Sequence, residues 1–236
     1  MADWDTFASE YDRIFLESRI YRKTIDTIVD LVGDGESRVL DLGCGTGNVT
    51  ASLIARRPEA RVLAVDPSDG MREVASRRFT DAVSVSVAPG DALSIPADDC
   101  DFDYVMSNIA LHHIPPENRY DCTKEVARVL KPGGEFIYAD FFCDVEGGPG
   151  DAAWYKNIIE SHTAYAMDCI DCGANEMMIL MFKSLPATLQ ADGEHLTTEQ
   201  TWIAQLQRAG FHDFKVISIP PEATCTRILH TLKKEI

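Results

Sequence analysis

The chain has 236 residues, 45% of them hydrophobic and 25% charged, which is the composition of an ordinary folded protein with room for one large domain. A net charge of −16 repels phosphate backbones and anionic membranes, so nucleic acid is not an expected partner. No apolar run approaches the ~20 residues of a membrane span. The cysteines number seven, and an odd number fits a reducing compartment better than a set of disulfides. We therefore expect a cytoplasmic protein.

The first thirty residues show helical periodicity. Trp4, Phe7 and Tyr11 are spaced to share one face of a helix. A second periodic run extends from Tyr21 to Val32 and ends before a glycine. We therefore predict one or two helices over residues 4–32.

A short apolar run, Val39 to Leu42, predicts a buried strand with the acidic Asp41 near its end. Three glycines at alternate positions, 43, 45 and 47, follow it and lead into a helix-like segment. Glycine permits positive φ and lets a ligand lie against bare backbone, and the start of a helix favours a carboxylate or phosphate. This stretch is typical of a cofactor-binding turn.

Strand-like and helix-like segments then alternate up to residue 142. The strand-like segments are residues 61–66, 83–87, 102–107 and 135–142, and the main helical ones are 67–79 and 115–130. Such alternation is typical of a parallel, doubly wound α/β sheet with helices on both faces.

A glycine-rich break at 147–150 interrupts this rhythm. Residues 151–190 are mostly helical in pattern and rich in aromatic residues and methionine, so we interpret 144–195 as a helical insertion over the sheet. A helix over 198–209 and two strands, 214–219 and 226–232, follow; the strands are suited to antiparallel pairing.

Two ligand classes compete for the glycine turn. The dinucleotide pattern G-x-G-x-x-G requires glycine at position 48, which is Asn48, whereas glycine stands at 47. Asp41 would repel a diphosphate and attract a cation. A ligand with an amino acid moiety fits these features better than a dinucleotide.

These motifs resemble the class I S-adenosylmethionine-dependent methyltransferases. The family motif stands here as Asp41 to Gly47, and the resemblance continues at Asp66, Gly90 to Ala92, Asn108 to Ile114 and Leu130 to Gly134. It covers residues 1–142 and 196–236. It implies a Rossmann-like sheet of seven strands, mostly parallel, with an antiparallel C-terminal strand.

The resemblance also implies how the chain is organised and what it binds. A single domain, 1–236, would comprise an N-terminal helical lid (1–32), a cofactor-binding core (37–142), a substrate-cap insertion (144–195) and a C-terminal helix with a strand pair (196–236). S-adenosylmethionine would be the cofactor and S-adenosylhomocysteine the product. The residues expected to bind it are Tyr11, Asp41, Gly43, Cys44, Gly45, Gly47, Asp66, Pro67, Ser68, Met71, Gly90, Asp91, Ala92 and Asn108.

Each role has a structural alternative. Asp66 precedes Pro67 and Ser68 and could cap a helix, and Asp91 could be a turn residue. The aromatic stripe from Trp4 to Tyr11 could be ordinary helix packing rather than a cofactor lid.

Methyl transfer is an in-line displacement that depends on alignment, and some acceptors also need a base. The candidates are His112, His113, Asp140, His162 and Tyr165. The two adjacent histidines belong to an L-H-H-hydrophobic segment that recurs in the family, so a structural or cofactor-proximal role is the alternative for them.

The insertion is expected to select a small organic acceptor. Cys169 and Cys172 form C-x-x-C, but no second pair of zinc ligands accompanies them, so no metal site is predicted. The rival functions are a non-catalytic or cofactor-modifying binder of S-adenosylmethionine, a nicotinamide-dependent enzyme, which Asp41 and Asn48 disfavour, and a tRNA methyltransferase, which the charge disfavours. Either a monomer or a homodimer fits the sequence.

Overall fold

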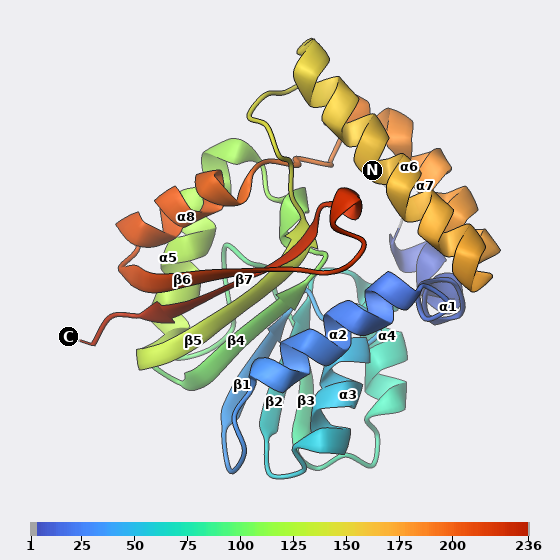
Figure 1. Cartoon of the computed structure of the whole chain (residues 1–236). Coiled ribbons are helices and arrows are strands. Elements are labelled where there is room, and N and C mark those ends of the chain that lie inside the picture. Colours follow the sequence, from blue (N-terminus) through green and yellow to red (C-terminus); the bar gives the residue numbers. More distant parts are fainter. Residues whose placement is uncertain (1–3, 236) are drawn as a thin grey trace.

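A seven-stranded mixed sheet forms the centre of the molecule, with the strands in the order β3-β2-β1-β4-β5-β7-β6 (Figure 1). The computed structural model describes residues 4–235, so residues 1–3 and 236 of the predicted lid and C-terminal segment lie outside it. The strands are β1 (Arg38–Leu42), β2 (Arg61–Asp66), β3 (Val85–Pro89), β4 (Phe102–Asn108), β5 (Leu130–Phe141), β6 (Phe211–Ser218) and β7 (Thr226–Lys233).

The first five strands run parallel, whereas β7 pairs antiparallel with both β5 and β6. The connection between β6 and β7 holds only a short 3₁₀ turn, Glu222–Thr224. A parallel pairing needs a crossover of a dozen or more residues, so this connection imposes the antiparallel direction. The predicted doubly wound fold with an antiparallel C-terminal strand is confirmed.

Several strand boundaries differ from the predicted ones, among them the start of β6, which lies at Phe211 rather than at residue 214. Val83 was placed in the third strand, but it is fully exposed and β3 begins at Val85. The fifth strand, predicted over 135–142, begins at Leu130, so Pro132 to Gly134 lie inside β5. The register between β4 and β5 shifts there, so the sheet accommodates the proline and glycines as an irregularity rather than a loop.

Helices cover both faces of the sheet. Figure 1 shows α2 (Arg19–Leu31), α3 (Asn48–Arg56) and α4 (Asp69–Arg78) on one face, and α5 (Arg119–Val129) and α8 (Glu199–Arg208) on the other. Each face has its own cluster of buried apolar side chains. The parallel strands β1 and β2 are thus largely buried on both sides, as their Val- and Leu-rich sequences require, whereas the edge strand β3 is only partly buried.

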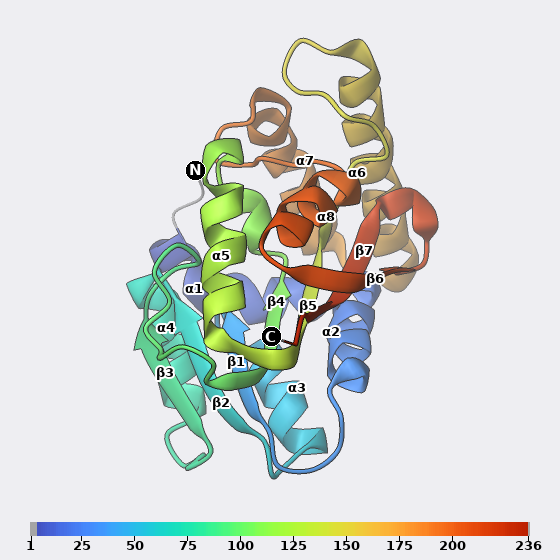
Figure 2. The same cartoon turned by 90° about the vertical axis from the view of Figure 1, so that its left-hand side faces the viewer.

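The predicted insertion forms a hairpin of two helices, α6 (Ala152–Cys172) and α7 (Asn175–Gln190), that stands beside the sheet (Figures 1 and 2). An ion pair from Arg13 to Glu176 links α7 to α1 (Trp4–Phe15), and one from Arg19 to Asp168 links α6 to the start of α2. The hairpin is therefore held to the N-terminal helices. No helix within residues 4–235 has the length and apolar character needed to cross a membrane.

Candidate functional site

The glycine turn after β1 has a backbone that side chains would disrupt. Gly43, Gly45 and Gly47 have φ values of 73°, 55° and 86°, in the left-handed region. A Cβ on Gly43 would lie 2.6 Å from the Ala110 Cβ, and one on Gly47 would overlap the Phe79 ring. The turn thus keeps its backbone close to its neighbours and leads directly into α3.

Asp41 lies beneath this turn rather than beside a cavity. Its Oδ2 accepts hydrogen bonds from the Thr50 backbone N–H, at 3.2 Å, and from the Thr50 hydroxyl, at 2.6 Å. Complete burial raises the pKa of this carboxyl to about 6, in spite of both bonds. In this structure Asp41 therefore fixes the first turn of α3 against β1.

A first cavity, which we term the strand-end cavity, opens where β1, β2 and β4 end. It is lined by Trp4, Tyr11, Tyr21, Leu42, Gly43, Cys44, Gly45, Val49, Asp66, Pro67, Ser68, Met71, Asp91, Ala92, Asn108, Ile109, Ala110, Leu111, His113 and Ile114. All the predicted cofactor residues are among them except Asp41, Gly47 and Gly90. Open α/β sheets bind their ligands at this edge.

Two polar side chains in the strand-end cavity suit a ligand. Asp66 accepts backbone N–H bonds from Gly45, at 2.8 Å, and from Ser68, at 2.9 Å, while burial raises its pKa. Asn108 is 7% exposed, and neither its amide nitrogen nor its amide oxygen has a hydrogen-bond partner among the described residues. Because a buried polar group without a partner is costly, the Asn108 amide fits a bound polar ligand.

Helix α1 covers this cavity and is tethered to α4. The Asp5 carboxylate accepts hydrogen bonds from the Ser68 hydroxyl, at 2.6 Å, and from the Gly70 N–H, at 2.9 Å. A Cβ on Gly70 would lie 2.6 Å from the Asp5 carbonyl oxygen, so glycine permits this close approach. Trp4 and Tyr11 consequently face the cavity.

A second carboxylate of α1 holds the glycine turn. Asp12 accepts hydrogen bonds from the Thr46 hydroxyl, at 2.5 Å, and the Asn48 amide, at 2.9 Å, and it forms an ion pair with Arg78. The residue that departs from the dinucleotide pattern, Asn48, therefore joins the N-terminal helix to the turn. These contacts set the position of α1 over the strand ends.

A second cavity, which we term the cap cavity, has a volume of about 530 Å³ and lies beneath the helical insertion. It is lined by Trp4, Thr6, Phe7, Glu10, Tyr11, Phe15, Ile109, His112, His113, Phe141, His162, Met177, Leu180, Met181, Ser184, Thr188, Glu194 and Leu196. Trp4, Tyr11, Ile109 and His113 line both cavities. The two cavities therefore adjoin at these four residues.

The predicted catalytic residues divide between the cap cavity and the protein interior. His112, His113 and His162 line the cavity, whereas Asp140 and Tyr165 do not and are fully buried. The Tyr165 hydroxyl is 2.8 Å from the Ser18 hydroxyl at the start of α2, and burial raises its pKa. Tyr165 thus packs α6 onto the N-terminal helices, outside the cavity.

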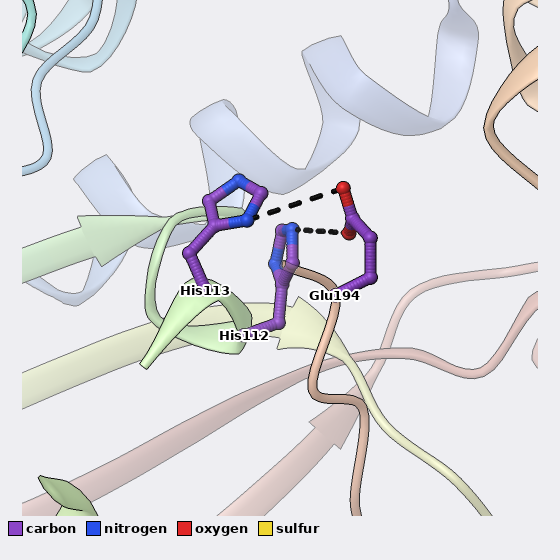
Figure 3. Close-up of side chains that lie close together, drawn as sticks. All are labelled: His112, His113 and Glu194. Atoms are coloured by element: carbon purple, nitrogen blue, oxygen red, sulfur yellow. Dashed lines mark ion pairs between the residues drawn. The ribbon is translucent and has the colours of Figure 1, made fainter. Parts of the chain in front are cut away.

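Asp140 does not line the cavity but holds His112, which does. Its Oδ1 is 2.6 Å from His112 Nδ1, and its Oδ2 accepts hydrogen bonds from the His112 N–H, at 3.0 Å, and the Tyr138 hydroxyl, at 2.8 Å. Nε2 of His112 lies 3.2 Å from Glu194 Oε2 (Figure 3). Burial alone would lower the pKa of His112, but the two carboxylates raise it to about 10.

The neighbouring His113 has the opposite electrostatic environment. Its Nδ1 lies 2.7 Å from the Gly193 carbonyl oxygen, and its ring meets Trp4 edge-on at 5.6 Å between centroids. Burial and the positive charge of His112 lower the pKa of His113 to about 4. It is therefore neutral at pH 7, with Nδ1–H donating to Gly193 and Nε2 left as an acceptor.

Glu194 is a residue that sequence reasoning missed. It lies in the irregular segment between α7 and α8, and its carboxylate faces both His112 and His113 (Figure 3). No motif marks it in the sequence, because its partners lie some eighty positions earlier. A polar Asp-Gly-Glu-His run after a long helix was the one available signal, and it is equally typical of a loop.

The C-x-x-C pair takes no part in either cavity. Cys169 is buried and Cys172 partly exposed, and all seven cysteines are free thiols. Burial raises the pKa of Cys169 to about 12, so its thiol remains protonated at pH 7.

Comparison with known proteins identifies related chains. A family model described as methyltransferase domain matches residues 39–134. An uncharacterized methyltransferase of Staphylococcus carnosus is 33% identical over 156 residues, which cover 64% of this chain and 72% of that protein. A demethylmenaquinone methyltransferase of Staphylococcus saprophyticus is 33% identical over 141 residues, or 57% of this chain and 58% of the relative, less than two thirds of its length.

Solved structures share the fold at lower identity. A protein in complex with the Haloferax volcanii Trm112 methyltransferase activator has a TM-score of 0.69 and 20% identity, covering 100% of this chain and 99% of that one. The phosphoethanolamine N-methyltransferase 2 of Haemonchus contortus, solved with S-adenosyl-L-methionine, has a TM-score of 0.68 and 16% identity, covering 98% of this chain and 57% of that one. At these identities the likeness concerns the fold alone.

Proposed function

Because the chain belongs to the class I S-adenosylmethionine-dependent methyltransferases, we propose that it binds S-adenosylmethionine in the strand-end cavity and methylates a small molecule held in the cap cavity. The observation that carries this proposal is that the two cavities adjoin at four shared residues. An in-line displacement needs the methyl donor and the acceptor atom to meet at such a junction.

The residues of the strand-end cavity fit the cofactor. Asp66 would accept hydrogen bonds from the ribose hydroxyls, and Asp91 would meet the adenine amino group. Asn108 would pair its unsatisfied amide with the methionine moiety beside the Gly43 to Gly45 backbone. The bound cofactor supplies an electrophilic methyl group on a sulfonium.

Helix α1 and the helical insertion complete the arrangement. In this proposal residues 1–32 act as a lid over the cofactor, 37–142 as the binding core, 144–195 as the acceptor cap and 196–236 as the end of a single domain. The contacts of Asp5 and Asp12 with α4 and the glycine turn support the lid.

The acceptor is a small, largely apolar molecule with one polar group. Apolar and aromatic side chains dominate the lining of the cap cavity, and its polar residues include three histidines and Glu194. The name demethylmenaquinone methyltransferase, which a relative bears, also denotes a small-molecule acceptor. The net charge of −16 argues against tRNA.

His113 is the proposed base. It lies at the junction of the cavities, and its neutral imidazole leaves Nε2 able to accept a proton from an acceptor hydroxyl or amine. Tyr165 and Asp140 have no direct role in this proposal, because both are buried outside the cavities.

Calorimetric titration with S-adenosylmethionine, S-adenosylhomocysteine and NAD tests cofactor choice. The proposal expects binding of the two sulfur compounds and not of NAD, with loss of binding in Asp66→Ala. No binding of either sulfur compound would refute it. A screen of metabolites with methyl-labelled cofactor then tests transfer; cofactor binding without transfer to any class of small molecule would favour the non-catalytic alternative.

A further inference from the structure

The cap cavity has one strongly polar wall. His112 and His113 form a short 3₁₀ turn, Leu111–His113, directly after β4, and Glu194 approaches them from the segment before α8 (Figure 3). Ligand atoms of these three side chains all lie within 4.8 Å of one another. His112 Nε2 is 3.2 Å from Glu194 Oε2, and His113 Nδ1 is 4.0 Å from Glu194 Oε1.

We propose that His112, His113 and Glu194 bind one divalent transition-metal ion, such as Zn²⁺, Co²⁺ or Fe²⁺, on this wall of the cap cavity. Two imidazoles and one carboxylate are donors that these ions prefer, whereas Mg²⁺ and Ca²⁺ prefer oxygen alone. Bonds of about 2.1 Å place neighbouring ligand atoms about 3.0–3.4 Å apart. The His112–Glu194 separation already fits, whereas the 4.0 Å between His113 Nδ1 and Glu194 Oε1 would have to shorten on binding.

Hydrogen bonds from residues outside the three-ligand group fix the orientation of His112, as is usual in metal sites. Asp140 holds Nδ1 of His112 at 2.6 Å and is itself held by the Tyr138 hydroxyl at 2.8 Å. A metal-binding histidine usually gives its second ring nitrogen to such a carboxylate, which fixes the ring and aims the other nitrogen at the ion. Here the free nitrogen, Nε2, points at Glu194 (Figure 3).

The segment that carries Glu194 is fixed to the histidine turn. The His195 N–H donates to the His112 carbonyl at 2.8 Å, and Arg119 donates to the His195 carbonyl at 2.7 Å. His113 contacts the Gly193 carbonyl at 2.7 Å; coordination through Nδ1 would replace this contact and move the ring proton to Nε2, so the metal-bound state excludes the base role of His113. The His195 and Arg119 bonds hold the backbone beside Glu194 in place, so less entropy is lost when an ion binds.

Charge balance also favours a divalent ion. Among residues 4–235, the ion-pair partners of Asp140 and Glu194 are histidines alone. The Asp140 side chain is fully buried and the Glu194 side chain is 19% exposed, so two carboxylates in a largely enclosed site face imidazoles alone. A divalent ion bound to the three side chains would neutralise the charge of both carboxylates.

The ion would face the cap cavity with open coordination positions, because three protein ligands do not complete its shell. An acceptor with a carbonyl, enolate or phenolate oxygen would occupy one of them. This second step rests on the proposed function; metal binding itself does not, because it is measured without cofactor or acceptor.

The test uses the full chain, stripped with a chelator and titrated with Co²⁺, whose visible absorption reports its ligands, and with Zn²⁺ by calorimetry. We expect one ion per chain and at least a tenfold loss of affinity in Glu194→Gln. Asp140→Asn should lower the metal affinity about 10–100-fold, because the carboxylate that orients His112 through its second ring nitrogen is removed. His195→Gln, adjacent to Glu194 but outside the three-ligand group, is the matched control and should bind as the wild type does.

Absence of stoichiometric Co²⁺ and Zn²⁺ binding by the wild type would overturn the proposal, as would equal affinity in Glu194→Gln. Thermal unfolding of each stripped variant shows whether it is folded. If Asp140→Asn unfolds, Glu194→Gln and His195→Gln still decide the outcome. Cofactor titration of the stripped wild type gives a separate result, so failure of the metal site and failure of the proposed function are distinguishable.

Discussion

Replacing Asp41 by asparagine should abolish a specific pH dependence of stability. Asp41 is buried beneath the first turn of α3, and burial raises its pKa from the ordinary 3.8 to about 6. The folded chain therefore binds this proton more tightly than the unfolded chain does. Stability from this group is present at low pH and is lost as the pH rises from 3.8 to about 6.

The size of the effect follows from the two pKa values. They differ by 2.2, and at about 1.36 kcal/mol per pKa unit the full effect is about 3 kcal/mol. Between pH 7.5 and 4.5, the free energy of unfolding of the wild type should rise by about 2 kcal/mol relative to Asp41→Asn, which has no proton to gain.

Urea unfolding followed by circular dichroism at several pH values measures this difference. Comparing the two chains cancels the carboxyl groups that titrate in both. Thr50→Val provides an independent check, because it removes a 2.6 Å bond to the ionised carboxylate and should cost more stability at pH 7.5 than at 4.5. Parallel curves for the wild type and Asp41→Asn across this range would refute the reasoning.

Three further predictions concern the cavities. Asn108→Leu should raise stability by about 1–3 kcal/mol, because it removes a buried amide without partners, yet weaken S-adenosylmethionine binding; unchanged affinity by calorimetry would contradict the role of Asn108. Gly70→Ala should displace α1, because the added Cβ would lie 2.6 Å from the Asp5 carbonyl oxygen. We expect hydrogen exchange in α1 to become faster and cofactor binding to weaken several-fold. Tyr165→Phe should cost about 1 kcal/mol in thermal unfolding through the lost Ser18 contact and leave cofactor affinity unaltered; a changed affinity would place Tyr165 in the site after all.

Some of the fold and the strand-end cavity followed from sequence because their determinants are local. Alternating strands and helices impose parallel pairing, and parallel strands bring their carboxyl ends to one edge. Asp66, Asp91 and Asn108 each stand at or just beyond such an end, so their convergence required no knowledge of side-chain packing.

Other features required the tertiary structure. The sequence placed Asp41 next to the glycines, but only the packing of α3 on β1 decided that its carboxylate meets Thr50 instead of the cavity. Tyr165 has the residue type of a catalytic group, and the docking of α6 on the start of α2 turned it toward Ser18.

The polar wall of the cap cavity depended most on the tertiary structure. The sequence determined that His112 and His113 follow a strand end, where ligands bind. It did not determine that Glu194 would face them, since that contact spans about eighty residues and depends on how the helical hairpin returns to the sheet. Local patterns specify strands, turns and helix starts, whereas contacts between distant irregular segments depend on the packing of everything between them.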